Sequence, residues 1–158
     1  MHVVQKTTPE QPLLIRDVRR DEIQRLYDID QICFPAYAAY SRVELLFFLN
    51  HESSISRVAE RDGKVLGFAI GQVKTNAQAH VVTIDVIPEA RRGMVGHALM
   101  ETMHAEFRAR GAGQVSLEVD TRNDAAQQFY ADLGYVRTNF LRGYYKRRGD
   151  AYRMLLNL

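Results

Sequence analysis

The sequence predicts a mixed α/β domain of about seven strands and four helices. Strand-like and helix-like segments alternate along most of the chain, and one long amphipathic helix separates two β-rich halves. The 158 residues are 46% hydrophobic and 25% charged, so the chain can bury a core without disulfides or a structural metal. We expect a loose tail over residues 1–12 and a single domain over residues 13–158.

Two helices are expected before the main part of the sheet. Residues 13–18 are strand-like, and residues 20–34 place apolar side chains at helical spacing behind an acidic first turn. Ser41 stands three residues before Glu44, which is the spacing of a capping box at the start of a second, short helix.

A β-hairpin follows these helices. The dipeptide Asp62-Gly63 separates strand-like residues 55–61 from strand-like residues 64–75, and it is the strongest short-range signal for a hairpin turn. A fourth strand is predicted over residues 80–87, where Pro88 stops it.

The long helix begins near Val95 and is expected to end at Gly111. Its apolar stripe consists of Val95, Leu99, Met103 and Phe107. The opposite face carries His97, Glu101, His104 and Arg108. We expect this second face to be solvated, so that the two histidines bind no metal.

The C-terminal third completes the sheet. Residues 114–120 alternate between apolar and polar side chains, as in a half-buried strand. Asn123 is the expected N-cap of a helix that ends at Gly134. Two last strands are predicted over residues 135–144 and 151–157.

The single cysteine and the lack of apolar runs limit the setting of the protein. Cys33 cannot form an internal disulfide or a cysteine-based zinc site, which favours a reducing cytoplasm. The first residues lack the pattern of a signal peptide, and no run of about 18 apolar residues predicts a membrane span. We therefore expect a cytoplasmic protein with no membrane association and no metal.

The charge is unevenly composed. The chain has 17 Arg but only 4 Lys, at a net charge of only +2. Arginine suits phosphates and carboxylates because its guanidinium is planar and forms two parallel hydrogen bonds. Three explanations remain open at this point: a nucleic-acid surface, a phosphate-bearing cofactor, or ordinary solvated surface.

The turn between the fourth strand and the long helix is a candidate anion site. It reads V-I-P-E-A-R-R-G-M-V-G-H-A-L, with Arg91 and Arg92 in the turn and glycines at 93 and 96. Unpaired amides and the positive end of the helix dipole attract a phosphate or pyrophosphate there. The segment matches neither G-x-x-x-x-G-K-[ST] nor G-x-G-x-x-G, which argues against a nucleotide hydrolase or a dinucleotide enzyme.

This turn resembles the motif V-x-P-x-x-[RQ]-x-x-G-x-[GA]-x-x-L of the GNAT (Gcn5-related) N-acetyltransferases. Counted from Pro88, Arg91, Gly96 and Leu99 fall on motif positions, whereas Met94 replaces the first motif glycine. A second block, N-x-x-A-x-x-[FL]-Y-x-x-x-G-[FY], matches from Asn123 to Tyr135. The segments I-C-F-P-A-Y and R-G-Y-Y-K-R-R-G-D-A-Y-R-M-L are similar to the ribosomal-protein-alanine, or RimI-like, branch.

The resemblance implies an acetyl-CoA cofactor in a cleft between the fourth and fifth strands, and no metal. In the family the turn binds the pyrophosphate and the fourth strand pairs with the pantetheine arm. The cofactor residues that it implies here are Val86, Ile87, Arg91, Arg92, Gly93, Met94, Val95, Gly96, His97 and Asn123. Met94 has a Cβ at a position where family members usually have none, which bears on how tightly this turn closes.

Two residues are expected to carry the proton transfers. Glu118 lies on the polar side of its strand and, by resemblance to the branch, is the general base; a solvated or ion-paired carboxylate is the alternative. Tyr130 is the candidate acid for the departing thiolate, the alternative being a buried tyrosine with a satisfied hydroxyl. The neutral form of an α-amine costs about 3.4 kcal/mol less than that of lysine at neutral pH, so an N-terminal acceptor needs only a modest base.

The resemblance also indicates the acceptor side. Phe34 and Tyr37 after the first helix, with Tyr144 and Tyr145 in the last hairpin, are the expected substrate residues. The predicted partner is a protein or peptide N-terminus, for which a ribosomal protein is one candidate, with no direct DNA binding and a monomer or weak homodimer. The basic segment 137–153 favours an acidic peptide or an RNA neighbourhood, or consists of rim arginines alone. A small-amine or antibiotic-type acetyltransferase and a non-catalytic acyl-CoA-binding module remain the alternatives.

Overall fold

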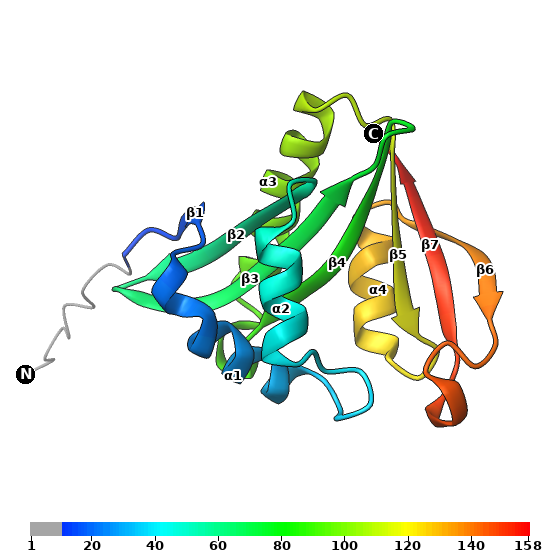
Figure 1. Cartoon of the computed structure of the whole chain (residues 1–158), viewed down its shortest axis with the longest axis horizontal. Coiled ribbons are helices and arrows are strands. Elements are labelled where there is room, and N and C mark those ends of the chain that lie inside the picture. Colours follow the sequence, from blue (N-terminus) through cyan, green and yellow to red (C-terminus); the bar gives the residue numbers. More distant parts are fainter. Residues whose placement is uncertain (1–10) are drawn as a thin grey trace, which may run out of the picture.

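The computed structural model describes residues 11–158, and a seven-stranded sheet forms their centre (Figure 1). The strand order is β1-β2-β3-β4-β5-β7-β6. The strands are β1 (Leu14–Asp17), β2 (Ser54–Arg61), β3 (Lys64–Val73), β4 (Gln78–Val86), β5 (Gln114–Asp120), β6 (Val136–Leu141) and β7 (Ala151–Asn157). The predicted mixed fold is confirmed; most of the expected tail, residues 1–10, lies outside the described residues.

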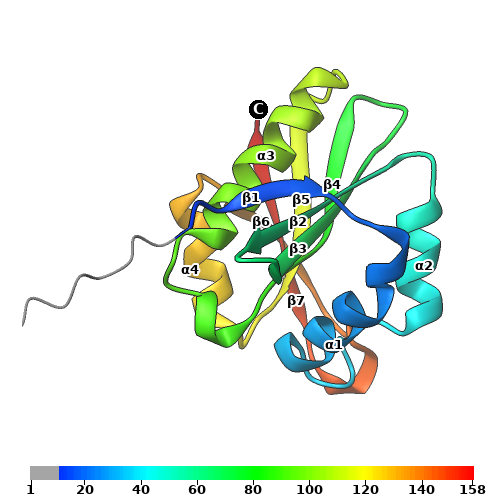
Figure 2. The same cartoon turned by 90° about the vertical axis from the view of Figure 1, so that its left-hand side faces the viewer.

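The described residues form four α-helices, which cover the two faces of the sheet (Figure 2). They are α1 (Ile23–Cys33), α2 (Arg42–Asn50), α3 (Val95–Ala109) and α4 (Asp124–Asp132), with single 3-10 turns at Arg20–Glu22, Pro88–Ala90 and Lys146–Arg148. One apolar cluster lies between the sheet and α1 and α2, and a second lies between the sheet and α3 and α4. The sheet is thus buried on both faces, which fixes the relative positions of the loops at its open end.

The local turn and cap signals in the sequence are confirmed. Asp62 and Gly63 both adopt positive φ, at 52° and 74°, as a tight hairpin turn requires. The Ser41 hydroxyl accepts a hydrogen bond from the backbone N–H of Glu44 at 3.1 Å, and the Asn123 side chain caps α4. Each signal depends only on residues within a few positions of one another.

His104 is not on a solvated face, so the prediction for this residue is wrong. Its exposed fraction is 7%, and its Nε2 lies 2.7 Å from the Tyr135 hydroxyl. Tyr135 immediately precedes β6 and covers this side of α3, a contact that the periodicity of the helix alone cannot show. Burial lowers the pKa of His104, which keeps the ring neutral.

Divergence of β4 from β5 creates the site. The two strands are parallel but pair only at Gln78, Ala79 and His80. Further along, β5 continues with β7 while β4 stays with β3, where a register shift opposite Ile70 and Gly71 leaves Val82 as an extra residue. Among residues 11–158, the second half of β4 therefore has no strand partner on the β5 side, and its main chain borders an opening.

Candidate active site

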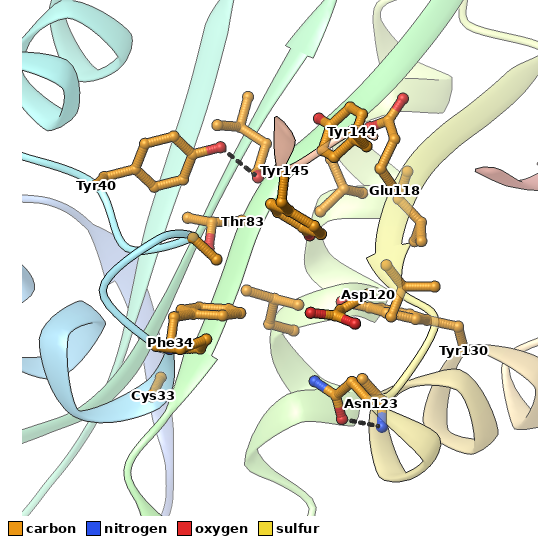
Figure 3. Close-up of a pocket in the computed structure, with 18 of the residues that line it drawn as sticks. Cys33, Phe34, Tyr40, Thr83, Glu118, Asp120, Asn123, Tyr130, Tyr144 and Tyr145 are labelled. Carbon is orange, nitrogen blue, oxygen red and sulfur yellow. Dashed lines mark hydrogen bonds between the residues drawn. The ribbon is translucent and has the colours of Figure 1, made fainter. Parts of the chain in front are cut away.

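Two adjoining cavities fill the opening between β4 and β5. One has a volume of about 360 Å³ and is rich in tyrosines; we call it the aromatic cavity (Figure 3). The other, of about 370 Å³, lies against the start of α3; we call it the loop cavity. The residues that line both are Cys33, Phe34, Ile84, Asn123, Ala126 and Tyr130. One ligand can therefore extend through the loop cavity and meet a second ligand in the aromatic cavity.

The start of α3 presents unpaired amides to the loop cavity. Met94 is the N-cap, in the left-handed conformation with φ 63°, and no side chain caps the helix. The first amides of such a helix have no partner within the helix and attract an anion. A Cβ added at Gly96 would lie 3.1 Å from the Phe129 ring, so glycine here allows α3 and α4 to pack closely. Arg91 and Arg92 add positive charge at the same place.

Most of the expected cofactor residues line the loop cavity. They are Val86, Arg91, Arg92, Met94, Gly96, His97 and Asn123. Arg91 Nε also donates to the Val86 carbonyl at 3.0 Å, which ties the turn to β4. The other three do not line it: Val95 is fully buried in the core, Ile87 packs on the α1 and α2 side, and Gly93 lies in the turn itself. These three can contribute only through the backbone.

All four expected substrate residues meet in the aromatic cavity. Phe34 and Tyr37 come from the segment between α1 and α2, and Tyr144 and Tyr145 come from the segment between β6 and β7. Tyr145 lies centrally in Figure 3, with its ring centre 5.4 Å from that of Tyr37 and 5.0 Å from that of Tyr144. Segments more than a hundred residues apart in the sequence thus form one aromatic roof.

A polar clasp joins these two segments at the rim. The Tyr37 hydroxyl donates to Asp120 Oδ2 at 2.6 Å, and Arg122 Nη2 donates to the Tyr37 oxygen and to the carbonyl of Arg148 at 2.6 and 2.7 Å. Burial raises the pKa of Asp120, but hydrogen bonds from Arg122 and Tyr37 outweigh it and hold this pKa at about 2. The clasp was not expected from the sequence, because its members lie in three separate segments.

Glu118 lines the aromatic cavity, and its carboxylate is fixed in place by two neighbouring side chains. Its Oε2 lies 2.6 Å from His80 Nε2, and its Oε1 accepts from Arg153 at 3.3 Å. Burial raises the pKa of Glu118, but these two neighbours outweigh it and lower the pKa below its usual range. Glu118 is therefore ionised at neutral pH and can accept a proton through a hydrogen bond.

His80 was not expected in the site, and Arg153 was expected only as a member of the basic segment 137–153, not as a partner of Glu118. His80 is 38 residues from Glu118, and only the pairing of β4 with β5 brings them together. Arg153 is the strand partner of Glu118 in the β5–β7 ladder. A histidine near the end of the paired part of β4 was the one available signal, and it becomes informative only once the strand register is known.

Tyr130 lies between the two cavities and lines both. It projects from α4 toward the opening in Figure 3. Burial raises the pKa of its phenol, so the hydroxyl stays protonated and available as a donor. The site thus has a proton acceptor in one cavity, a proton donor at the boundary and an anion site in the other cavity.

No cluster of three or more His, Cys, Asp or Glu side chains suited to a metal ion occurs among residues 11–158. None of the described helices is long and apolar enough to cross a membrane.

Comparisons with known proteins agree with this geometry. Residues 23–135 match the model of the Acetyltransferase (GNAT) family. An N-alpha-acetyltransferase of Sulfurisphaera tokodaii is 30% identical over 155 residues, covering 89% of this chain and 90% of the relative.

Solved structures give the same result. Ard1 from Thermoplasma volcanium has a TM-score of 0.85 at 30% identity, covering 92% of this chain and 97% of that one. The ribosomal-protein-S18-alanine N-acetyltransferase from Escherichia coli has a TM-score of 0.82 at 28% identity, covering 92% and 94%.

Proposed function

Because the chain belongs to the acetyltransferase (GNAT) family, we propose that it transfers the acetyl group of acetyl-CoA to the α-amine of a protein N-terminus. The observation that carries the proposal is the Glu118 carboxylate, held by His80 and Arg153 in the wall of the aromatic cavity. The relatives described above support the N-terminal acceptor, since two of them are named for acetylation of an α-amine or of a protein alanine.

The loop cavity fits the cofactor. Its free α3 amides, Arg91 and Arg92 suit the pyrophosphate, and the unpaired main chain of β4 beside Ile84 and Val86 suits the amide-containing pantetheine arm. Acetyl-CoA, when bound, supplies a thioester that an amine attacks directly in a ternary complex. Tyr130 at the boundary of the cavities holds a phenolic proton for the sulfur that departs.

The aromatic cavity suits the acceptor. The Glu118 carboxylate takes the proton of the amine, and His80 keeps that carboxylate in place. A carboxylate of lowered pKa is a weak base. A weak base suits an α-amine acceptor, because forming the neutral α-amine at neutral pH costs about 3.4 kcal/mol less than forming the neutral lysine side chain. Phe34, Tyr37 and Tyr145 supply apolar surface for the first residues of the peptide.

The basic segment 137–153 has several roles in this proposal. Arg153 belongs to the site, and Arg137 lies over the Tyr152 ring at 4.4 Å. Four exposed basic residues stand in the sequence on either side of Tyr144 and Tyr145, which line the aromatic cavity: Arg142, Lys146, Arg147 and Arg148. We assign these four to an acidic stretch that follows the acceptor N-terminus, with a cytoplasmic protein, a ribosomal protein among the candidates, as the substrate.

The test is mass spectrometry of a peptide library incubated with the protein and acetyl-CoA. We expect acetylation of free N-termini, with acidic sequences preferred after them. Glu118→Gln and Tyr130→Phe should each lower kcat by about a hundredfold or more, whereas Glu101→Gln, the same change on an exposed carboxylate of α3, should leave it unchanged. Faster acetylation of free small amines than of peptides would contradict the acceptor class, and normal turnover by both variants would contradict the catalytic roles.

A further inference from the structure

Two buried carboxyl groups face each other behind the cleft, and the proposed mechanism uses neither. Asp30 on α1 and Asp85 on β4 have exposed fractions of 0% and 1%, and each carboxyl acts on the pKa of the other. Asp85 lies between Ile84 and Val86, whose side chains line the loop cavity on the opposite face of the strand. Only strand β4 therefore separates the carboxyl pair from the loop cavity.

The hydrogen bonds of the pair leave room for one shared proton. Thr83 Oγ1 donates to Asp85 Oδ1 at 2.5 Å, and the backbone N–H of Tyr40 donates to Asp30 Oδ2 at 2.6 Å. The remaining oxygens, Asp30 Oδ1 and Asp85 Oδ2, are buried and meet no donor among the described residues. A single proton between these two oxygens gives both a partner, whereas two buried carboxylates in contact repel each other.

The surroundings of the pair do not supply a compensating charge in the core. The titratable groups that act on it are Cys33 of α1, Tyr40, Glu44 of α2, Arg91 after β4 and Tyr130 of α4. Arg91 is the one cation among these five, and it is an exposed residue that hydrogen-bonds to the Val86 carbonyl. Burial raises the pKa of both carboxyls, that of Asp85 well above its usual range.

The pair connects to the acceptor side through Tyr40. This residue belongs to the segment 35–41, which also carries Tyr37 of the aromatic roof. The Tyr40 hydroxyl donates to the carbonyl of Val82 at 3.3 Å, so both ends of the residue are attached to β4, one directly and one through Asp30 and Asp85. The segment that carries Tyr37 is thus attached to β4 in part through the carboxyl pair.

We propose that Asp30 and Asp85 are positioning residues for the acceptor: one shared proton ties segment 35–41 to β4, and loss of that proton releases the segment and weakens acceptor binding. The proposal rests on the proposed function as far as the acceptor is concerned. The folded form binds this proton more tightly than the unfolded chain does. The tie is therefore complete below the raised pKa and is lost as the pH rises through it.

The kinetic experiment measures KM for an acceptor peptide and for acetyl-CoA from neutral to alkaline pH. In Asp85→Asn, an amide N–H that does not titrate takes the place of the shared proton as the donor to Asp30. Asp30→Ala removes the carboxylate that accepts the hydrogen bond from the Tyr40 N–H. We expect the peptide KM of the unmodified protein to rise at alkaline pH and that of Asp85→Asn to stay level. Asp30→Ala should raise the peptide KM about tenfold and change kcat and the acetyl-CoA KM less than about twofold.

Tyr135→Phe is the matched control, since it removes a buried hydrogen bond on the other side of the sheet. It should not change the pH dependence of the peptide KM. The same alkaline rise in Asp85→Asn, or an equal loss in both KM values and kcat for Asp30→Ala, would overturn the proposal.

A second readout needs no substrate and so separates this proposal from the proposed function. Amide hydrogen exchange at Tyr40, corrected for the intrinsic effect of pH, should show protection that falls at alkaline pH in the unmodified protein and persists in Asp85→Asn. If no peptide is acetylated but this pattern appears, the function fails and the tie stands. If protection at Tyr40 is the same at every pH in both proteins, the tie is refuted whatever the substrate.

Discussion

Replacing Met94 by glycine is expected to stabilise the protein by about 0.5–1 kcal/mol. Met94 has φ 63° and ψ 12°, a left-handed conformation that costs a residue with a Cβ about 1–2 kcal/mol. Glycine removes this strain but gains about 0.4–1 kcal/mol of conformational entropy in the unfolded chain, which offsets part of it. The methionine side chain is 66% exposed, so little buried surface is lost with it.

Urea unfolding measures this change, and the expected gain corresponds to a rise in Tm of about 1–4 °C for a chain of this size. Met94→Ala is the control, because it removes the exposed side chain and keeps the Cβ. It should be no more stable than the unmodified protein. An equal gain from alanine and glycine would refute the reasoning, since the stabilisation would then come from the lost side chain rather than from the relieved backbone.

Three further predictions concern stability and charge. Gly71→Ala should cost about 1–3 kcal/mol in unfolding free energy, because the added Cβ would meet the buried Phe107 ring; thermal unfolding checks it. Asn123→Ala should cost about 1 kcal/mol through loss of the α4 cap, measured in the same way, and an unchanged Tm would contradict the role of the cap. Arg122→Gln should raise the pKa of Asp120 from about 2 toward 3.8 in a carbon-13 NMR titration. A carboxyl whose pKa is lowered by folding stabilises the fold at pH values above its pKa in the unfolded chain, and this stability is lost as the pH falls through the folded pKa. In Arg122→Gln the folded pKa of Asp120 is higher, so the loss on acidification should begin at a higher pH than in the unmodified protein.

The sequence by itself determined the features that depend on neighbouring residues. Asp62-Gly63 fixed the β2–β3 turn because both residues tolerate positive φ, and Asn123 fixed the start of α4 because its side chain reaches an amide three residues further on. The two motif blocks likewise indicated the family, since the turn before α3 and the helix α4 are each continuous in the sequence. Tyr37, Tyr144 and Tyr145, which line the aromatic cavity, were expected in the site in the same way, by resemblance within continuous segments.

Only the tertiary structure decided which of these pieces meet. The early divergence of β5 from β4 opened the cleft, and the strand register placed His80 and Arg153 on Glu118. Asp30 and Asp85 are 55 positions apart in the sequence and become a pair only because α1 packs on β4. Periodicity reports which face of an element a residue occupies, but the partner on that face comes from another element. Charge pairing, burial and the pKa values that follow from them are therefore set by long-range packing.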